Sequence, residues 1–410
     1  MRALARFFRA AYSELPAQVW WLCAVAFVNR AGTMVVPFLT LWLTIERSYS
    51  VVEAGWLVAC FGLGSILGAW LGGLATDRVG PFGVQVASLA GSGALFVVLG
   101  RLHGTLELGA TLALLGLVAD AFRPANYAMV AANCAPQLRG RAFALLRLAV
   151  NLGWSIGPAL GGLLAKLSYA LLFWIDGATS IAAAALLLAL RARLAAHGEP
   201  TERIPSTGPG PWRDRAFLIA LGATFAIALV FMQFLYTVPL QYRRHHGLDE
   251  ADIGLLSALN SLIIVAVEMA LVHALRGRRE LPIVAVGAFF IAIGFGITPL
   301  GTSFLFASFA VSIWTLGEML ESPLLMSWVA SRAGAGERGR YLALLTMVHS
   351  LALLLAPIVG TQLFREPGPA WLFGACFVVG SLAALAFLVA DRAARGGPSA
   401  GRESKARWQD

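Results

Sequence analysis

Twelve apolar stretches follow one another along this chain, and each is long enough for a helix to cross the hydrocarbon core of a bilayer, which takes about 20 residues. Only 13% of the 410 residues are charged, whereas an average soluble domain has roughly 25%. The chain is therefore predicted to be an all-α membrane protein with 12 transmembrane helices. The predicted spans are 17–44, 51–76, 82–101, 106–131, 139–165, 169–190, 216–241, 251–275, 281–300, 303–330, 339–364 and 369–390.

The positive charges fall mainly on one side of the predicted membrane. With the N-terminus inside, 22 of the 31 Lys and Arg residues lie in inside segments or at the inside ends of spans, six lie in outside segments or at an outside end, and three lie deep within spans. Because Lys and Arg accumulate in cytoplasmic loops, both termini are predicted to be cytoplasmic. The net charge of +9 then reports orientation, and no nucleic-acid partner is expected.

The chain is predicted to consist of two similar halves. A Gly-, Pro- and charge-rich linker, 191–215, separates six-helix bundles at 1–190 and 216–390, and a polar tail, 391–410, is expected to be disordered. An even number of helices gives both copies the same orientation, which is the parallel repeat of secondary transporters with a substrate site between the halves. A shift of 199 residues carries Pro124 onto Pro323, Pro158 onto Pro357 and Gly161 onto Gly360, and Pro37 pairs with Pro239 at a shift of 202.

Two motifs resemble those of the major facilitator superfamily. "GGLATDRVG" at 72–80 is similar to its loop motif between helices two and three, although Pro81 and Phe82 stand where the family usually has basic residues. "GWSIGPALGG" at 153–162 is similar to its fifth-helix motif, which is associated with proton-driven antiporters. The resemblance covers 17–390 and implies the fold of that superfamily.

Gating roles are expected for the motif residues and for basic residues near the same predicted membrane boundary. Asp77 is predicted to meet a helix N-terminus, Arg141 or the basic stretch at 276–279 in a state-dependent ion pair. A boundary anchor is the alternative for Asp77, and plain helix packing is the alternative for the glycines. The gating set is Gly73, Asp77, Arg78, Gly80, Arg141, Gly153, Gly157, Pro158 and Arg276.

Ionisable side chains at membrane depth usually face a cavity or a partner, because exposing them to lipid is costly. The first half has three arginines at depth and one acid, whereas the second half has three glutamates and no Lys or Arg. A carboxylate removed from water favours its protonated form. Static ion pairs between the halves are the alternative. The candidates for proton coupling are Glu318, Glu321, Asp120, Glu268 and His349.

Polar and aromatic side chains share helix faces with these charges and are expected to contact substrate. A cationic half opposite an acidic half would suit a zwitterion. Asp176 is expected to be only a boundary residue of the sixth span. The candidates for substrate binding are Asn29, Arg30, Arg123, Tyr127, Arg147, Asn151, Trp154, Tyr236, Asn260 and Trp314.

Local stretches narrow the expected function. "FRPANYAMVA" and "GEMLESPLLM" resemble helices four and ten of proton-coupled oligopeptide transporters, whereas "FVNRAGT" looks more like bacterial drug and dipeptide exporters. The leading hypothesis is a proton-coupled antiporter that exports drugs or short peptides. A proton symporter importing di- or tripeptides is the alternative, and a membrane sensor or an enzyme is less favoured.

Other features restrict the cofactors and partners. No phosphate-binding loop occurs, so ATP-driven pumping is not expected. All four cysteines fall within or close to the ends of spans, so neither a disulfide nor a metal site is expected. The protein is therefore expected to need no cofactor besides a proton gradient, and its partners are expected to be protons, a small-molecule substrate and the lipid bilayer. A monomer in a bacterial inner membrane is expected.

Overall fold

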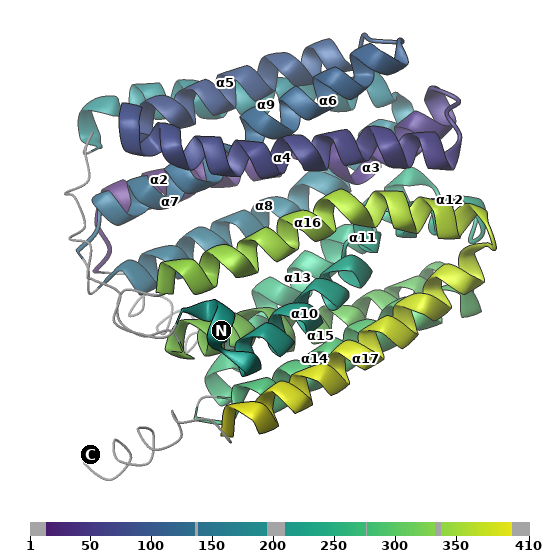
Figure 1. Ribbon diagram of the computed structural model, residues 1–410. Coiled ribbons are helices and arrows are strands. Elements are labelled where there is room, and N and C mark those ends of the chain that lie inside the picture. Colours follow the sequence, from purple (N-terminus) through teal and green to yellow (C-terminus); the bar gives the residue numbers. More distant parts are fainter. Residues whose placement is uncertain (1–13, 136–137, 195–209, 276, 333–337, 396–410) are drawn as a thin grey trace, which may run out of the picture. The chain divides into compact units, whose positions relative to one another are not determined.

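The computed structural model describes residues 14–135, 138–194, 210–275, 277–332 and 338–395, and every regular element in these ranges is helical (Figure 1). By length and composition, twelve helical segments could cross a membrane, and each overlaps a predicted span. The predicted membrane class and helix number are therefore confirmed.

The helices of the first half correspond to six spans, two of which are interrupted. They are α2 (Ala17–Ala31) with α3 (Val35–Leu41) and the π-helical turn η1 (Trp42–Glu46), α4 (Val51–Val79), α5 (Pro81–Leu99), α6 (Thr105–Asp120) with α7 (Phe122–Ala132), α8 (Arg139–Leu167) and α9 (Tyr169–Ala189).

The second half has the same number of spans, of which the first is interrupted. Its helices are α10 (Arg215–Phe231) with α11 (Gln233–Tyr236) and α12 (Val238–Arg244), α13 (Glu250–Ala274), α14 (Glu280–Ile297), α15 (Phe304–Arg332), α16 (Arg338–Arg365) and α17 (Pro369–Arg395). Short 3₁₀ turns lie at 191–193, 211–213 and 298–300.

Local signals set several helix ends. Ser50 and Glu53 form a reciprocal capping box at the start of α4, in which each side chain accepts the other residue's backbone N–H. Gly80 ends α4 with φ of +92°, a conformation that glycine adopts without a steric penalty, and Pro81 opens α5. This places the end of the predicted loop motif at a sharp turn.

Breaks in three spans were not predicted, although a kink was expected at Pro37 in the first. Each break precedes or adjoins a proline, Pro37, Pro124 or Pro239, which lacks the N–H that would bond the carbonyl four residues earlier. Proline alone does not explain the breaks, because Pro158 and Pro323 lie inside continuous helices. In the span that contains Pro37, a second cause of the break is a side chain from another helix that binds the start of α3.

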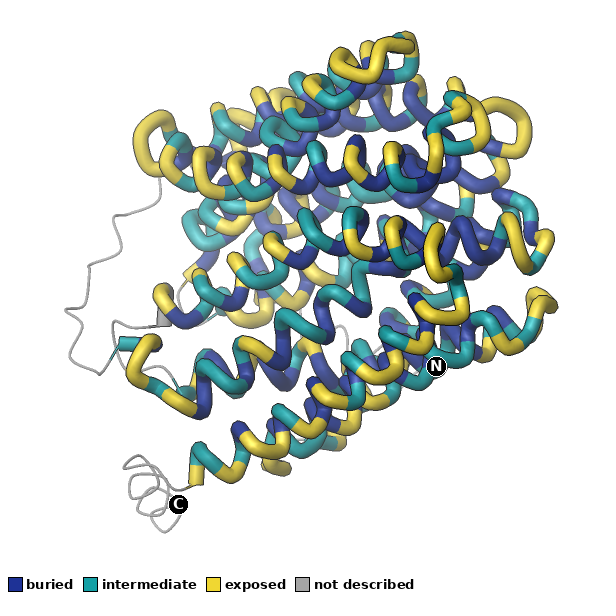
Figure 2. The backbone as a smooth tube through the Cα atoms, turned by 45° about the vertical axis from the view of Figure 1, so that its right-hand side comes forward, coloured by how far each residue is buried: buried dark blue, intermediate teal, exposed yellow. Residues whose placement is uncertain are grey.

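The described residues form two compact units. Unit 1 comprises those within Met1–Thr201 and Leu235–Val265, and unit 2 those within Glu202–Phe234 and Ala266–Asp410. In unit 1, α2 packs against α8 and α9; in unit 2, the corresponding α10 packs against α16 and α17. The same partnership in both halves agrees with the sequence repeat. Along individual helices buried and exposed residues alternate, so that one face of each packs inward (Figure 2).

The predicted domain boundaries stay predictions. Most of the linker, 195–209, lies outside the described residues, as do 396–410 of the tail. Helix α17 runs to Arg395, beyond the predicted end of its span at 390.

Candidate functional site

A cavity of about 280 Å³ within unit 1 brings together five of the residues predicted to contact substrate. Its lining contains three guanidinium groups and no carboxylate. Such a site is suited to an anionic group, because guanidinium forms paired hydrogen bonds with carboxylate and phosphate oxygens. The lining residues are Arg30, Phe122, Arg123, Asn126, Tyr127, Leu146, Arg147, Val150 and Trp154.

Helical spacing explains why these side chains converge. Arg123 and Tyr127 are four residues apart on α7, and Arg147 and Trp154 are seven apart on α8, so each pair shares a helix face. Arg30 comes from the last turn of α2. The ring of Tyr127 lies edge-on to that of Phe143, with 5.5 Å between their centroids, which orients one wall of the cavity.

A smaller cavity of about 60 Å³ in the same unit contains acids as well as a base. Arg30 lines both cavities and Asp120 lines only this one. Asp120 pairs with Arg123 at 3.6 Å, and their side chains are 18% and 57% exposed. The polar lining residues are Asn29, Arg30, Thr33, Ser88, Ser92, Asp120, Asp176 and Ser180.

The sequence suggested that Asp176 is a boundary residue, and the structure shows that it is not. It lies in the middle of α9 and is 2% exposed. Its Oδ2 accepts the backbone N–H groups of Met34 at 3.1 Å and Val35 at 3.0 Å. These are donors that would otherwise lack partners at the start of α3. Asp176 therefore binds the broken end in the first span. Its partners lie about 140 residues away in the sequence, so no local pattern could have shown this.

Asn126 is a second residue that the predictions omitted. It lines the larger cavity, is 4% exposed, and its Oδ1 has no hydrogen-bond partner within the described residues. Asn126 follows Arg123 by about one helical turn, so the sequence did indicate that the two side chains share a helix face. By contrast, Asn151, Tyr236 and Asn260 line neither cavity, and their substrate roles stay predictions.

In unit 2 the two glutamates of the tenth span lie one turn apart on α15. Glu321 is 6% exposed, and its Oε1 has no hydrogen-bond partner within the part of the chain that the structure describes. Glu318 is partly buried. A buried carboxylate oxygen without a donor is costly unless a proton or a cation neutralises it, which fits the predicted proton-coupling role without testing it.

Trp314 belongs to an aromatic cluster on the same helix. Its ring lies 5.7 to 5.9 Å from the rings of Phe231, Phe234 and Phe295, and it is 4% exposed. Packing therefore accounts for its position, and direct substrate contact stays a prediction.

Two further proton-coupling candidates lie on other helices. Glu268, on α13, is partly buried. His349, on α16, is also partly buried, and its Nδ1 lies 2.9 Å from the carbonyl oxygen of Leu345. Their roles stay predictions.

The glycines of the fifth-helix motif allow α8 to lie close to the break between α2 and α3. A Cβ at Gly153 would lie 2.6 Å from the Cβ of Arg30, and one at Gly157 would lie 2.8 Å from the carbonyl oxygen of Thr33. The motif, which also contains Pro158, therefore supports the helix end from which Arg30 reaches the cavities.

One expected partner of Asp77, Arg141, pairs with another acid. Asp77 and Arg78 are exposed, and Arg141 pairs with Glu14 at 2.7 Å. A Cβ at Gly73 would have no heavy atom of the described residues within 4 Å, and Arg276 lies outside those residues. The proposed gating roles of these residues stay predictions.

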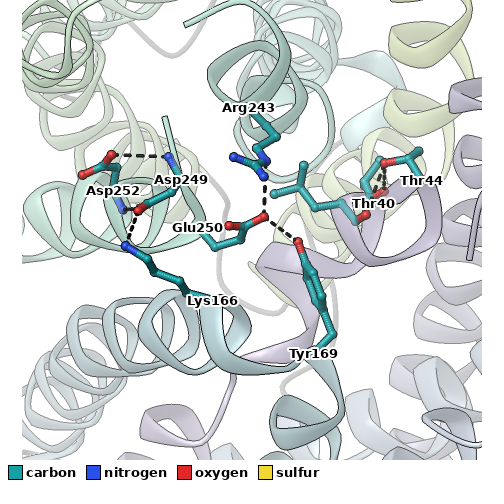
Figure 3. Close-up of polar contacts among 9 residues, drawn as sticks. Thr40, Thr44, Lys166, Tyr169, Arg243, Asp249, Glu250 and Asp252 are labelled. Atoms are coloured by element: carbon teal, nitrogen blue, oxygen red, sulfur yellow. Dashed lines mark hydrogen bonds and ion pairs between the residues drawn. The ribbon is translucent and has the colours of Figure 1, made fainter. Parts of the chain in front are cut away.

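A polar cluster joins the ends of α8 and α9 to α12 and α13 within unit 1 (Figure 3). Glu250, 6% exposed, lies 3.4 Å from Arg243 and accepts a 3.1 Å hydrogen bond from Tyr169. Beside it, Lys166 pairs with Asp249 at 2.7 Å, and this hydrogen bond holds the pKa of Asp249 below its usual range. We call these five residues the Glu250 cluster.

No group of three or more His, Cys, Asp and Glu residues with metal-binding geometry occurs in the described ranges. All four cysteines are free thiols.

The family model of the Major Facilitator Superfamily matches residues 22–353. The chain belongs to this superfamily. It is therefore a multi-pass membrane transporter of small molecules and not an enzyme.

Relatives and solved structures agree with this assignment. A Na⁺, Li⁺, K⁺/H⁺ antiporter of Planococcus maritimus is 24% identical over 88% of this chain and 92% of its own length. Multidrug resistance protein 1 of Bacillus subtilis is 24% identical over 82% and 87%. A crystal structure of a variant of the peptide transporter POT in complex with sulfate is similar in fold, with a TM-score of 0.79 at 16% identity over 93% of this chain and 95% of that one.

Proposed function

We propose that this transporter is a proton-coupled antiporter that exports small organic molecules, drugs or short peptides, by alternating access. The observation that carries the proposal is the larger cavity, where Arg30, Arg123 and Arg147 line one space without a carboxylate. The substrate is expected to place an anionic group among these guanidinium groups, with Tyr127 and Trp154 against its apolar part.

The proposed proton carriers are acids on both halves of the chain. Glu321 has an unpartnered carboxylate oxygen in a buried position, and Glu318 lies one turn away. Asp120 pairs with one of the cavity arginines. An anionic substrate that binds Arg123 would compete with Asp120 for it, so substrate and proton binding would depend on each other. The proton gradient across a bacterial inner membrane would drive transport by a monomer, with no cofactor.

One relative favours exchange against protons, because it is named a cation/proton antiporter. Another is named a multidrug resistance protein, which agrees with an organic substrate. If the antiport mode extends to this chain, the proton and the exported substrate move in opposite directions.

Proton-coupled import of di- or tripeptides is the second candidate. It is favoured by the fold likeness to POT peptide transporters and by the "FRPANYAMVA" stretch, which supplies Arg123, Asn126 and Tyr127 to the cavity. A peptide's carboxylate would bind the arginines and its amine an acid.

Flux measurements in proteoliposomes with an imposed pH gradient test the proposal. Dipeptides, amino acids, cationic dyes and the cations Na⁺ and K⁺ are compared in parallel. Antiport predicts that a substrate moves against the proton flow, whereas symport predicts movement with it. A gradient that drives none of these probes would contradict proton-coupled transport.

A further inference from the structure

We propose that Asp176, in the smaller cavity, is a second proton-binding group of unit 1. This inference rests on the proposed proton coupling but places a proton on a carboxylate outside the acids considered so far. Asp176 is the one charged residue of α9, and it lies at the depth of the cavity rather than at a helix end. Three observations support the inference: a polar cavity, a hydroxyl without a hydrogen-bond partner among the described residues, and a carboxylate oxygen, Oδ1, outside the two hydrogen bonds that Asp176 accepts.

The cavity is suited to water. Ser180 lines it, is 1% exposed, and its Oγ has no hydrogen-bond partner among the described residues. A buried hydroxyl of this kind normally binds ordered water. The volume of about 60 Å³ holds several water molecules, since each needs about 10–15 Å³. Water in this space gives a proton a route between Asp120 and Asp176, which both line it.

The two oxygens of Asp176 have different surroundings. Oδ2 accepts the N–H groups of Met34 and Val35, and Oδ1 takes part in neither bond. Ser180 is four residues later on α9 and therefore lies on the same face. A proton from water can bind Oδ1 while Oδ2 still accepts both N–H groups, so protonation does not require the broken helix end to separate from α9.

Few charges compensate Asp176. The elements packed against α9 are α2, α3, α5, α8 and the turn 191–193. Neither α3 nor α5 has a charged residue, Arg30 is the one charge of α2, and the basic residues of α8 and of the turn do not line this cavity. Arg30 and Asp120 are thus the charged groups that share the space with Asp176.

Arg30 links this proton site to the substrate. Because Arg30 lines both cavities, an anion in the larger cavity competes with Asp176 and Asp120 for its charge. A carboxylate that loses its compensating charge in a buried position binds a proton more readily. Substrate binding would therefore promote proton uptake at Asp176.

The proton would in turn act on the helix break. Hydrogen bonds to a charged carboxylate are roughly twice as strong as those to a neutral one. Protonated Asp176 would bind Met34 and Val35 less tightly, only four and five residues after Arg30. We infer that the charge of Asp176 and the position of Arg30 change together during transport.

Infrared difference spectroscopy of the purified transporter between alkaline and acidic pH tests this inference without a substrate. Asp176→Asn keeps an oxygen for the two N–H groups and removes the titrating carboxyl group. The wild-type spectrum should contain one protonated-carboxyl band that is missing in Asp176→Asn. Glu321→Gln is the matched control and should leave that band in place. A variant spectrum with every wild-type carboxyl band would overturn the inference.

Ser180→Ala provides an independent readout that does not depend on the folding of Asp176→Asn. Removing the hydroxyl that faces the same cavity should shift the frequency of the Asp176 band, and an unshifted set of carboxyl bands would also contradict the proposal.

In flux assays, Asp176→Asn should retain substrate exchange and lower gradient-driven flux to its level without a gradient. If the pH gradient does not change flux through the wild-type protein, the proposed function is contradicted. The infrared bands would still decide whether Asp176 binds a proton.

Discussion

At the scale of single residues, Arg30 connects the two cavities of unit 1. It is the basic residue that lines both of them, the glycines of α8 pack against the helix end that carries it, and Asp176 accepts the N–H groups of Met34 and Val35 just beyond that end. Its function is therefore expected to depend on its position as well as on its charge.

Arg30→Ala should abolish transport of anionic substrates while the protein still reaches the membrane, and Arg30→Lys should retain transport with weaker binding. Lysine keeps the charge but lacks the planar pair of donors. A lost hydrogen bond to a charged group corresponds to about 1.5–3 kcal/mol, or a rise in KM of about 10- to 100-fold. Concentration-dependent flux and immunoblots of membranes measure both effects. Arg101→Ala, in an exposed loop position, is the control, and normal transport by Arg30→Ala would refute this role.

Asp214 allows a pH prediction at the same scale. It caps α10, accepting the N–H of Phe217, and it binds Arg332 at 2.6 and 2.8 Å and Tyr341 at 3.2 Å. Partial burial opposes its charge, but these hydrogen bonds outweigh burial and hold its pKa below the ordinary value of 3.8. Because the folded-state pKa is depressed, the stabilisation is present above pH 3.8 and is lost as pH falls below it.

Asp214→Asn should lower the free energy of unfolding by about 1–3 kcal/mol at neutral pH, and the difference from wild type should shrink below pH 3.8. Thermal unfolding in detergent at several pH values measures it. Arg365→Gln is the control, since Arg365 and Glu366 are 61% and 82% exposed and their pair should contribute little. Equal unfolding temperatures for Asp214→Asn and wild type at neutral pH would show that the prediction is wrong.

At the scale of elements, the break between α2 and α3 fits closely against α8. Gly153 and Gly157 face this break, so the fifth-helix motif is a packing surface for the helix that carries Arg30. The motif could serve packing and conformational change together, because both depend on the same close approach.

Gly153→Ala should destabilise the protein and weaken substrate binding. The added Cβ would lie 2.6 Å from the Cβ of Arg30, and overpacking of this kind costs about 1–3 kcal/mol. Gly73→Ala is the matched control, because a Cβ there would have no heavy atom of the described chain within 4 Å. Thermal unfolding and substrate affinity are measured for both variants. If Gly153→Ala behaves like Gly73→Ala, the proposed tight contact does not constrain Arg30.

The sequence predicted helices better than it predicted their interruptions. Apolar runs of membrane-spanning length are conspicuous, so all twelve spans could be found. Charges at membrane depth are equally conspicuous, and helical spacing was sufficient to group Arg123 with Tyr127 and Arg147 with Trp154. Asp176 was misread because its role depends on backbone N–H groups of a distant helix. Whether a proline breaks its helix also depends on such tertiary partners.

At the scale of the whole molecule, the Glu250 cluster joins helices of the first half to the start of the second within unit 1 (Figure 3). On the predicted topology these ends face outward. The depressed pKa of Asp249 means that its pair with Lys166 persists at mildly acidic pH. The pair therefore holds the end of α8 to the start of α13 without responding to ordinary changes in pH.

Reversing either charge of the Lys166–Asp249 pair should open this region, and reversing both should close it again. Lys166→Asp or Asp249→Lys alone places like charges side by side. The measurement is labelling of Thr40→Cys by a membrane-impermeant maleimide in a cysteine-free background, because Thr40 is 1% exposed and lies on α3, which packs against α8 and α12. Labelling should rise in each single variant and return to the starting level in the double variant. Equal labelling of the two single variants and the double variant would contradict a role of this pair in keeping the region closed.

The proposed coupling of substrate to protons requires acids that bind and release a proton. Arg30, Arg123 and Arg147 account only for the anionic part of a substrate. Glu318 and Glu321 in unit 2 are two of the acids predicted from the sequence for this role, and the burial of Glu321 agrees with it.

The most direct test of proton-coupled transport is flux through Glu318→Gln in proteoliposomes, measured once with a pH gradient and once as substrate exchange at equal pH. Glutamine keeps the size and hydrogen bonding of the side chain but does not titrate. The account predicts that gradient-driven flux is lost while exchange is at least partly retained. Gradient-driven flux at the wild-type rate would remove Glu318 as a carrier, and the same result for Glu321→Gln and Asp120→Asn would contradict acid-mediated coupling as a whole.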